Sequence, residues 1–269
     1  MSDPSPVIDD LNRESEEVDL LVRDLEESGW VRPTPAPGWT IAHQIAHLAW
    51  TDRSALLAVT DVEAFAKEVE KALASPDGFV DEGAQEGAGL PPATLLADWR
   101  SGRKALEDAL RAASPETRFP WYGPPMSAVS MATGRLMETW AHGQDVADAL
   151  GAVRPVTDRL RHVVRIGVRA RDFAFGVRGL EPPDEEFRVE VTGPAGEVWT
   201  YGPEGAAQRV TGPALDFCLL VTQRAHRADL AVRAQGHDAD RWLDIAQAFA
   251  GPPGAGRKPA RQEPKGTAE

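Results

Sequence analysis

Proline and glycine divide the first 150 residues of the chain into segments whose apolar residues recur every three or four positions. This period places the apolar side chains on one face of an α-helix, and that face must be buried against another element. Segments long enough for bundle helices cover about 7–27, 40–60, 91–113 and the stretch from Ser127 or Ser130 to Leu150. Helices of this length joined by loops predict an up-and-down four-helix bundle.

The segments between these helices are predicted from their composition. Residues 61–73 are expected to extend the second helix, whereas residues 75–89 are rich in Gly, Asp and Glu, lack apolar periodicity and are expected to form a mobile loop. Residues 119–125, Phe-Pro-Trp-Tyr-Gly-Pro-Pro, are expected to form a rigid aromatic loop, because their prolines lack an N–H donor and fix φ.

The apolar pattern changes from helical to alternating near residue 187. Residues 157–175 predict a helix that links the two halves of the chain. Residues 187–192 and 198–201 alternate around a Gly-Pro-Ala-Gly turn, which predicts a β-hairpin. We then expect a helix over 213–224, a short strand over 230–232 and a closing helix over 238–249.

These elements together predict an α+β chain with two domains. A helical bundle is expected over residues 1–155, and a linker helix with a small α/β domain over residues 156–250. The segment 251–269 is rich in Gly, Pro and charge, cannot bury apolar surface, and is predicted to be a disordered tail.

Charge and cysteine content narrow the possible partners and the compartment. With 29 Lys and Arg against 42 Asp and Glu, the net charge of −13 argues against nucleic acid and anionic membranes as partners. The single cysteine, Cys218, excludes an intramolecular disulfide and is expected to be a buried, unreactive thiol. Because the sequence shows no long apolar stretch and no basic, apolar leader, we expect a cytoplasmic protein. We further expect a monomer or homodimer whose partners are small molecules.

Two pairs of polar residues have the spacing that a metal ion needs. Glu138 and His142 lie four positions apart in one predicted helix, and His43 and His47 have the same spacing in another. Such pairs project from one face of a helix about one turn apart. On spacing alone, a surface hydrogen bond or a partly buried polar pair remains the more common outcome.

The residues around both pairs resemble a known family. Gly38-Trp39-Thr40 leads into the helix that carries His47, and Glu138-Thr139-Trp140-Ala141-His142 forms the second motif. Together they resemble the DinB-like helical-bundle superfamily, and within it the mycothiol-dependent maleylpyruvate isomerase family of actinobacteria. The resemblance implies that His47, Glu138 and His142 bind zinc, and that the C-terminal half is a small α/β domain akin to sterol-carrier proteins.

The resemblance also implies a chemistry. A zinc ion with two histidines and one carboxylate keeps a position for an incoming ligand, which in this family is the thiol of mycothiol. The thiolate would then isomerise, or be transferred to, a small electrophilic and anionic substrate. Arg224, with Arg227 as second choice, is expected to hold the anionic group. The alternative is a non-catalytic metal-containing protein that binds a small molecule or lipid.

Other polar residues near the motifs have more than one possible function. The family pattern does not use His43, which we interpret as a residue of the helix face or pocket. Asp52 and Asp145 could orient ligand imidazoles or be ordinary acidic residues. No function is assigned to Trp121 and Tyr122 of the aromatic loop.

Overall fold

The computed structural model describes residues 3–75, 78–254 and 256–260. The chain forms two compact units, Met1–Pro155 and Val156–Glu269. The first is helical and the second combines helices with a small sheet, so the predicted α+β class is confirmed.

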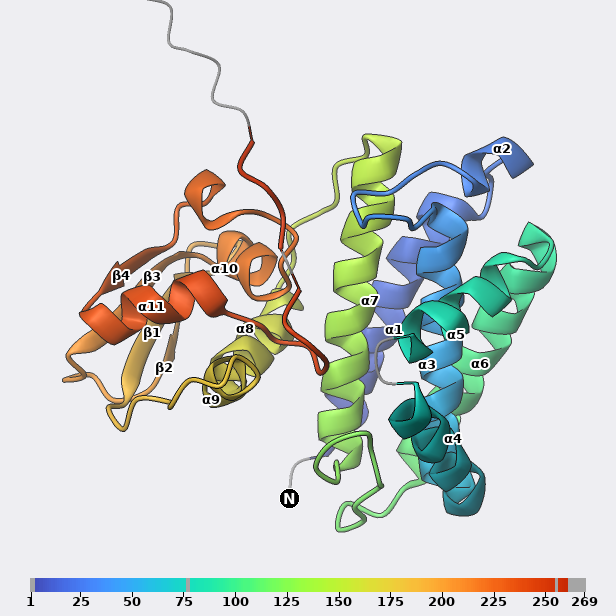
Figure 1. The fold of residues 1–269 in the computed structure, drawn as a ribbon, viewed down its shortest axis with the longest axis horizontal. Helices are drawn as coiled ribbons and strands as arrows, with labels where there is room; N and C mark the ends of the chain where they lie inside the picture. Colours follow the sequence, from blue (N-terminus) through green and yellow to red (C-terminus); the bar gives the residue numbers. More distant parts are fainter. Residues whose placement is uncertain (1–2, 76–77, 255, 261–269) are drawn as a thin grey trace, which may run out of the picture. The chain divides into compact units, whose positions relative to one another are not determined.

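The first unit is a bundle of long helices with shorter ones at its side (Figure 1). Its elements are α1 (Ser5–Val22), α2 (Glu27–Trp30), α3 (Ile41–Thr60), α4 (Val62–Ala74), α5 (Phe79–Ala88), α6 (Pro92–Ala112) and α7 (Ala128–Leu150). Helix α1 packs against α6 and α7, and α3 packs against the same two helices, which makes α1, α3, α6 and α7 the predicted four-helix bundle.

Apolar stripes from these helices meet in one core. Each stripe recurs at the spacing that puts its residues on one helical face, and burial of that face stabilises the bundle. The core includes Val18 and Val22 of α1, Ile41, Ile45 and Leu48 of α3, Leu95 and Trp99 of α6, and Val146 of α7.

The prediction of a mobile loop over residues 75–89 is wrong, because residues 79–88 form helix α5, which packs on α3. The glycines that suggested a loop allow close packing instead. A Cβ atom on Gly87 would lie 2.8 Å from the Cβ atom of Ala46. Ala84 is fully buried, and the ring of Phe79 lies 5.0 Å from that of Trp50. Residues 76 and 77 of the predicted loop lie outside the described residues.

The aromatic segment after α6 is an irregular loop, as predicted. Its two ends are held by paired hydrogen bonds between Phe119 and Met126. The rings of Trp121 and Tyr122 lie 5.7 and 5.1 Å from that of Phe65 in α4. The loop therefore packs against Phe65, the buried residue of α4.

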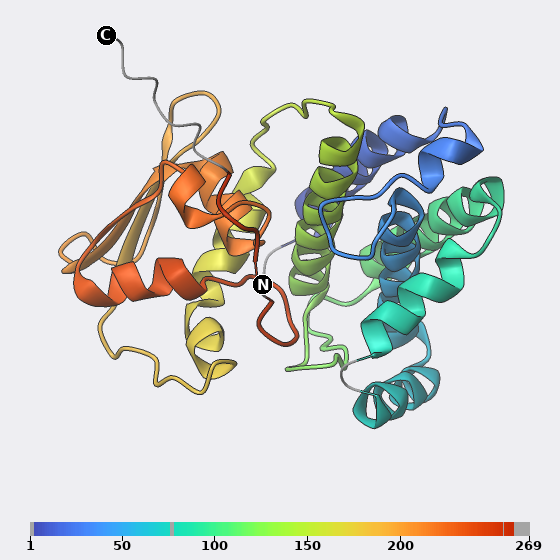
Figure 2. The same ribbon diagram turned by 45° about the horizontal axis from the view of Figure 1, so that its top comes forward.

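The second unit contains a four-stranded sheet in the order β2-β1-β3-β4 (Figure 2). Its elements are α8 (Leu160–Arg169), α9 (Arg171–Gly176), β1 (Phe187–Thr192), β2 (Val198–Tyr201), β3 (Gln208–Pro213), α10 (Ala214–Val221), a short 3₁₀ helix (Arg227–Asp229), β4 (Arg233–Gln235) and α11 (His237–Ile245). Strand β1 pairs antiparallel with β2 and parallel with β3, which pairs antiparallel with β4. Helices α10 and α11 pack against this sheet.

The predicted hairpin forms, but other elements of this unit differ from the prediction. The linking helix is divided into α8 and α9 at Ala170, and α11 ends at Ile245 rather than Phe249. The strand expected over 230–232 begins instead at Arg233, because the backbone N–H of Ala231 donates to the Asp216 carboxylate rather than to a strand. Strand β3 was not predicted.

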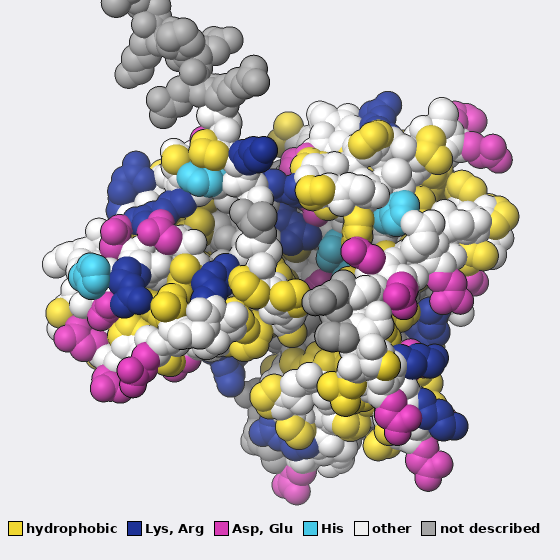
Figure 3. All heavy atoms as spheres, viewed as in Figure 1, with side chains coloured by type: hydrophobic (Ala, Val, Ile, Leu, Met, Phe, Trp, Pro, Cys, Tyr) yellow, Lys and Arg dark blue, Asp and Glu magenta, His cyan; other side chains and the backbone are white. Residues whose placement is uncertain are grey.

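Within the predicted tail, residues 251–254 and 256–260 form neither helix nor strand, and residues 255 and 261–269 lie outside the described residues. In the part of the chain that is described, no helix is both long and apolar enough to cross a membrane. Acidic and basic side chains are interspersed on the face shown in Figure 3.

Candidate metal centre

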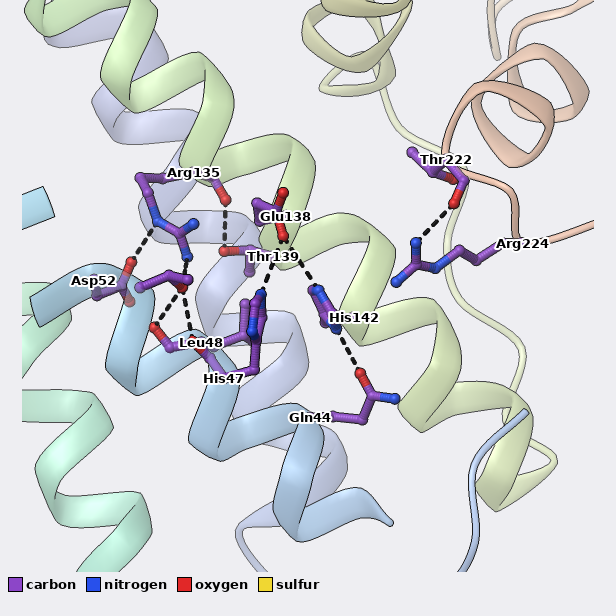
Figure 4. A network of polar contacts seen from close by, with 11 residues as sticks. Gln44, His47, Leu48, Asp52, Arg135, Glu138, Thr139, His142, Thr222 and Arg224 are labelled. Carbon is purple, nitrogen blue, oxygen red and sulfur yellow. Dashed lines mark hydrogen bonds and ion pairs between the residues drawn. The ribbon is translucent and has the colours of Figure 1, made fainter. Parts of the chain in front are cut away.

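Helices α3 and α7 bring together the three predicted ligands, His47, Glu138 and His142 (Figure 4). One potential ligand atom from each residue lies within 4.8 Å of the other two. The His47 and His142 side chains are 8% and 11% exposed, and that of Glu138 is 22% exposed. The group is therefore shielded on most sides while the carboxylate remains accessible.

The two distances from Glu138 to the histidines match those between the ligands of a tetrahedral metal site. Oε2 of Glu138 lies 3.3 Å from Nε2 of His47 and 3.2 Å from Nε2 of His142. Charge-assisted N–H···O bonds are shorter, about 2.7–2.9 Å. Zinc bonds of about 2.0–2.1 Å in tetrahedral geometry separate two ligand atoms by about 3.3 Å. The spacing and the two-imidazole, one-carboxylate donor set therefore fit an open zinc site.

The environment of Glu138 keeps it in the form that binds a cation. Burial alone would raise the pKa of this carboxyl group. Hydrogen bonds and positive charge from His142 and His47 outweigh burial and hold the pKa of Glu138 well below its ordinary value. Glu138 is therefore a carboxylate at neutral pH.

Tryptophan rings form the walls around the histidines. The ring of Trp39 lies 5.4 Å from that of His47 and stacks on His142 at 5.9 Å. On the other side, the Trp50 ring lies 5.9 Å from His47. Trp39 Nε1 donates to Asp81 of α5 at 2.9 Å, which ties this helix to the wall of the site.

His43 does not join the group, although it shares a helix with His47. Its Nδ1 accepts a hydrogen bond from the Thr40 backbone N–H at 3.3 Å. Its Nε2 lies 3.0 Å from Oε1 of Gln85 in α5. Both ring nitrogens of His43 are therefore used at the start of α3 and in holding α5.

Of the two acidic residues considered as orienting groups, Asp52 has other partners. Its carboxylate accepts from Arg135 Nε at 2.9 Å and from Trp99 Nε1 at 3.2 Å, all three residues being buried. Asp145 is fully buried in α7, and an orienting function for it remains a prediction.

Gln44 was not among the predicted site residues, although its Oε1 lies 2.5 Å from Nδ1 of His142. A usable signal existed, because a metal-binding histidine generally needs a hydrogen-bond partner for its second ring nitrogen. Gln44 lies three residues before His47 in α3, about one helical turn away, and is fully buried.

The predicted anion-binding residue, Arg224, belongs to the second unit and follows α10. Its Nη1 donates to the backbone oxygen of Thr222 at 2.7 Å (Figure 4). Arg227, the second choice, forms ion pairs with Asp240 and Asp244. The guanidinium of Arg227 therefore already binds two carboxylates.

Residues 11–147 match the family model described as Mycothiol maleylpyruvate isomerase N-terminal domain, and residues 183–235 match one described as Wyosine base formation. Two proteins of Mycobacterium tuberculosis, from strains CDC 1551 / Oshkosh and ATCC 25618 / H37Rv, both named as uncharacterized, are 59% identical over 257 residues. These matches cover 96% of this chain and 100% of each relative.

Solved structures share the fold. Crystal structures of the mycothiol-dependent maleylpyruvate isomerase and of a mutant of it align with a TM-score of 0.59 and 15% identity. The alignment covers 86% of this chain and 92% of that chain. The first family model spans half of the sequence and includes the whole metal-ligand group, and so the chain belongs to the mycothiol maleylpyruvate isomerase N-terminal domain family.

Proposed function

We propose that this chain is a zinc-dependent enzyme that uses mycothiol, a low-molecular-weight thiol, to isomerise or modify a small electrophilic, anionic substrate. The observation that carries the proposal is the convergence of His47, Glu138 and His142, with Glu138 at the ligand-to-ligand spacing of a tetrahedral site from both histidines. Family membership supports the thiol, since the matching model describes a mycothiol-dependent isomerase domain. We place the enzyme in the cytoplasm.

The residues of this chain would bind the cofactor and exclude water. When bound, a zinc ion with three protein ligands has a position for an external thiol and favours its deprotonation. Glu138 supplies negative charge, His47 and His142 supply one imidazole nitrogen each, and Trp39 and Trp50 shield the histidines. Cys218, the only cysteine, is fully buried, so the nucleophilic sulfur must come with a substrate.

Two reactions are compatible with such a thiol. In isomerisation, the sulfur adds to an activated carbon–carbon double bond, the resulting single bond rotates, and the same carbon–sulfur bond breaks to release the thiol unchanged. In transfer, the carbon–sulfur bond remains and a leaving group departs with its electron pair. Arg224 would hold the anionic group of the substrate in either case.

Cobalt substitution tests the proposal. Mycothiol added to the Co²⁺-loaded protein is expected to change the visible spectrum of the metal and release about one proton per site. The His142→Ala variant is the control and should show neither signal. A metal-loaded wild-type protein that gives no response to mycothiol would contradict the proposed thiol chemistry.

A cavity of the second unit favours the alternative, a binding protein. Its volume is about 610 Å³, and its lining combines apolar residues, among them Leu220, Leu230 and Leu243, with Arg178, Arg233 and the Asp240 and Asp244 carboxylates that pair with Arg227. Arg178 and Arg233 beside apolar side chains could bind an amphipathic anion. Saturable binding of a fluorescent fatty acid, together with no response of the metal to mycothiol, would establish this alternative.

A further inference from the structure

We infer that Gln44 is a positioning residue that selects the tautomer of His142 in which Nε2 is free to bind the metal. The inference rests on the proposed zinc site and extends it to a side chain outside the ligand set. It follows from one chain of hydrogen bonds, which begins at Thr34 and ends at His142.

The chain of hydrogen bonds begins at the hydroxyl group of Thr34. This hydroxyl group donates to the backbone oxygen of Trp39 at 2.9 Å, and the Thr34 backbone N–H donates to the same oxygen at 2.8 Å. A hydroxyl group has a single proton to donate. Towards Gln44, whose side-chain nitrogen lies 2.9 Å away, the oxygen of Thr34 can therefore only accept.

The second step is the orientation of the Gln44 amide. Since its NH₂ group faces Thr34, its oxygen faces Nδ1 of His142, at 2.5 Å. An amide oxygen has no proton, and so Nδ1 of His142 must be the donor. An imidazole must be neutral to bind a metal and then has one N–H, which in this form leaves the lone pair on Nε2. That atom is the one that faces Glu138 and His47.

The Gly38-Trp39-Thr40 turn fixes the start of this chain. Gly38 has a φ of +80°, which glycine adopts without strain, and a β-bridge joins Pro33 to Thr40. The turn thereby brings the backbone oxygen of Trp39 back to Thr34. We assign to this motif the function of orienting the Gln44 amide, in addition to starting α3.

The opposite orientation of the amide would give the wrong tautomer. If the Thr34 hydroxyl donated to Gln44, the amide NH₂ would face Nδ1 of His142 and the imidazole proton would move to Nε2. The Thr34 hydroxyl would then lose its bond to Trp39. No such device holds His47, whose buried Nδ1 has no hydrogen-bond partner among the described residues.

Variants of Gln44 test the inference through zinc affinity, measured by competition with a chromophoric chelator. Gln44→Leu keeps the approximate size but removes the acceptor, and should weaken zinc binding about 10–100-fold. Gln44→Glu restores an acceptor for Nδ1–H and should bind zinc within about threefold of wild type. Ser54→Ala, another buried polar residue of α3, is the matched control and should leave the affinity unchanged.

Nitrogen-15 NMR of the zinc-loaded wild-type protein tests the tautomer without any variant. We expect a protonated Nδ1 and a metal-shifted Nε2 for His142. Coordination through Nδ1, or wild-type affinity in Gln44→Leu, would overturn the inference while leaving the zinc site in place. If the wild-type protein binds no zinc through these residues, both this inference and the proposed function fail.

Discussion

The indole ring of Trp50 lies so close to Gly83 that a Cβ atom on Gly83 would come within 2.8 Å of two of its ring carbons. Trp50 therefore packs against the backbone of α5 on one side, while its ring lies 5.9 Å from that of His47 on the other. The position of α5 and the wall of the metal site thus depend on the same side chain.

Substitution of Gly83 should release α5 from α3. Gly83→Ala forces the new methyl group into the Trp50 ring, and we expect a loss of about 1–3 kcal/mol in the free energy of unfolding. Urea denaturation of both proteins measures it. Gly102→Ala in α6 is the control. Apart from its chain neighbours and the nearby backbone of α6, no described atom lies within 4 Å of a Cβ atom at this position. It should stabilise the protein by about 0.5–1 kcal/mol.

Removal of one ligand should abolish metal binding. We expect His142→Ala to retain less than about a tenth of the wild-type zinc content after dialysis, because two ligands alone do not form a stable zinc site. Elemental analysis of the purified proteins measures this. His43→Ala is the matched control from α3 and should retain its metal, since both ring nitrogens of His43 face other partners. Equal metal content in the His142→Ala variant would show that other residues bind the ion.

The ion pair of Asp19 should make stability depend on pH in the acidic range. Hydrogen bonds from Arg100, at 2.6 and 2.7 Å, hold the pKa of Asp19 below its ordinary value. A folded-state pKa below the unfolded one stabilises the protein fully above the unfolded pKa of about 3.9, and this contribution is lost as the pH falls through the folded pKa.

Asp19→Asn should therefore cost about 1.5–3 kcal/mol at pH 7 and progressively less below about pH 4. Urea denaturation at pH 7 and at acidic pH measures the difference. The control is Asp108→Asn, which removes an exposed pair with Lys104 and should cost less than about 0.5 kcal/mol. A loss in Asp19→Asn that does not change with pH would mean that packing, rather than charge, accounts for it.

The periodicity of apolar residues was sufficient to predict the long helices of the bundle, but it did not predict helix α5 or strand β3. Ile45 and Leu48 are spaced so that they lie on one face of α3, and the core buries this face. The apolar pattern of the sequence therefore indicates the helix. Helix α5 has no such signal, since it is stabilised by contacts of Gly83 and Gly87 with α3, more than 30 residues away in the chain. Strand β3 was missed because Gly212 and Pro213 at its end resemble the start of a helix.

The metal site was likewise predicted in part: its three candidate ligands were identified from the sequence, but Gln44 was not. The spacing of Glu138 and His142, together with the family resemblance, was enough to select the candidate ligands. Gln44 was not found because its partner His142 lies 98 residues further along the chain, and no periodic pattern encodes such a pairing. Its orientation depends in turn on Thr34, ten residues before it in the turn that precedes α3.

Replacement of Arg224 tests the proposed reaction most directly. Arg224→Lys preserves the charge but not the two parallel donors that bind a carboxylate or enolate. We expect it to keep the zinc content and mycothiol affinity of the wild type while losing about 2–4 kcal/mol of transition-state stabilisation, roughly a hundredfold or more in turnover. Arg227→Lys is the control, because Arg227 is paired with Asp240 and Asp244, and should affect stability rather than turnover.

The measurement needs a substrate, which a screen of electrophilic acids and enones with mycothiol would supply, with His142→Ala as the metal-free control. Wild-type rates in Arg224→Lys would exclude the proposed function of that arginine alone. Turnover that persists in His142→Ala would exclude the metal-dependent mechanism altogether, because that variant lacks one of the three residues that form the proposed zinc site.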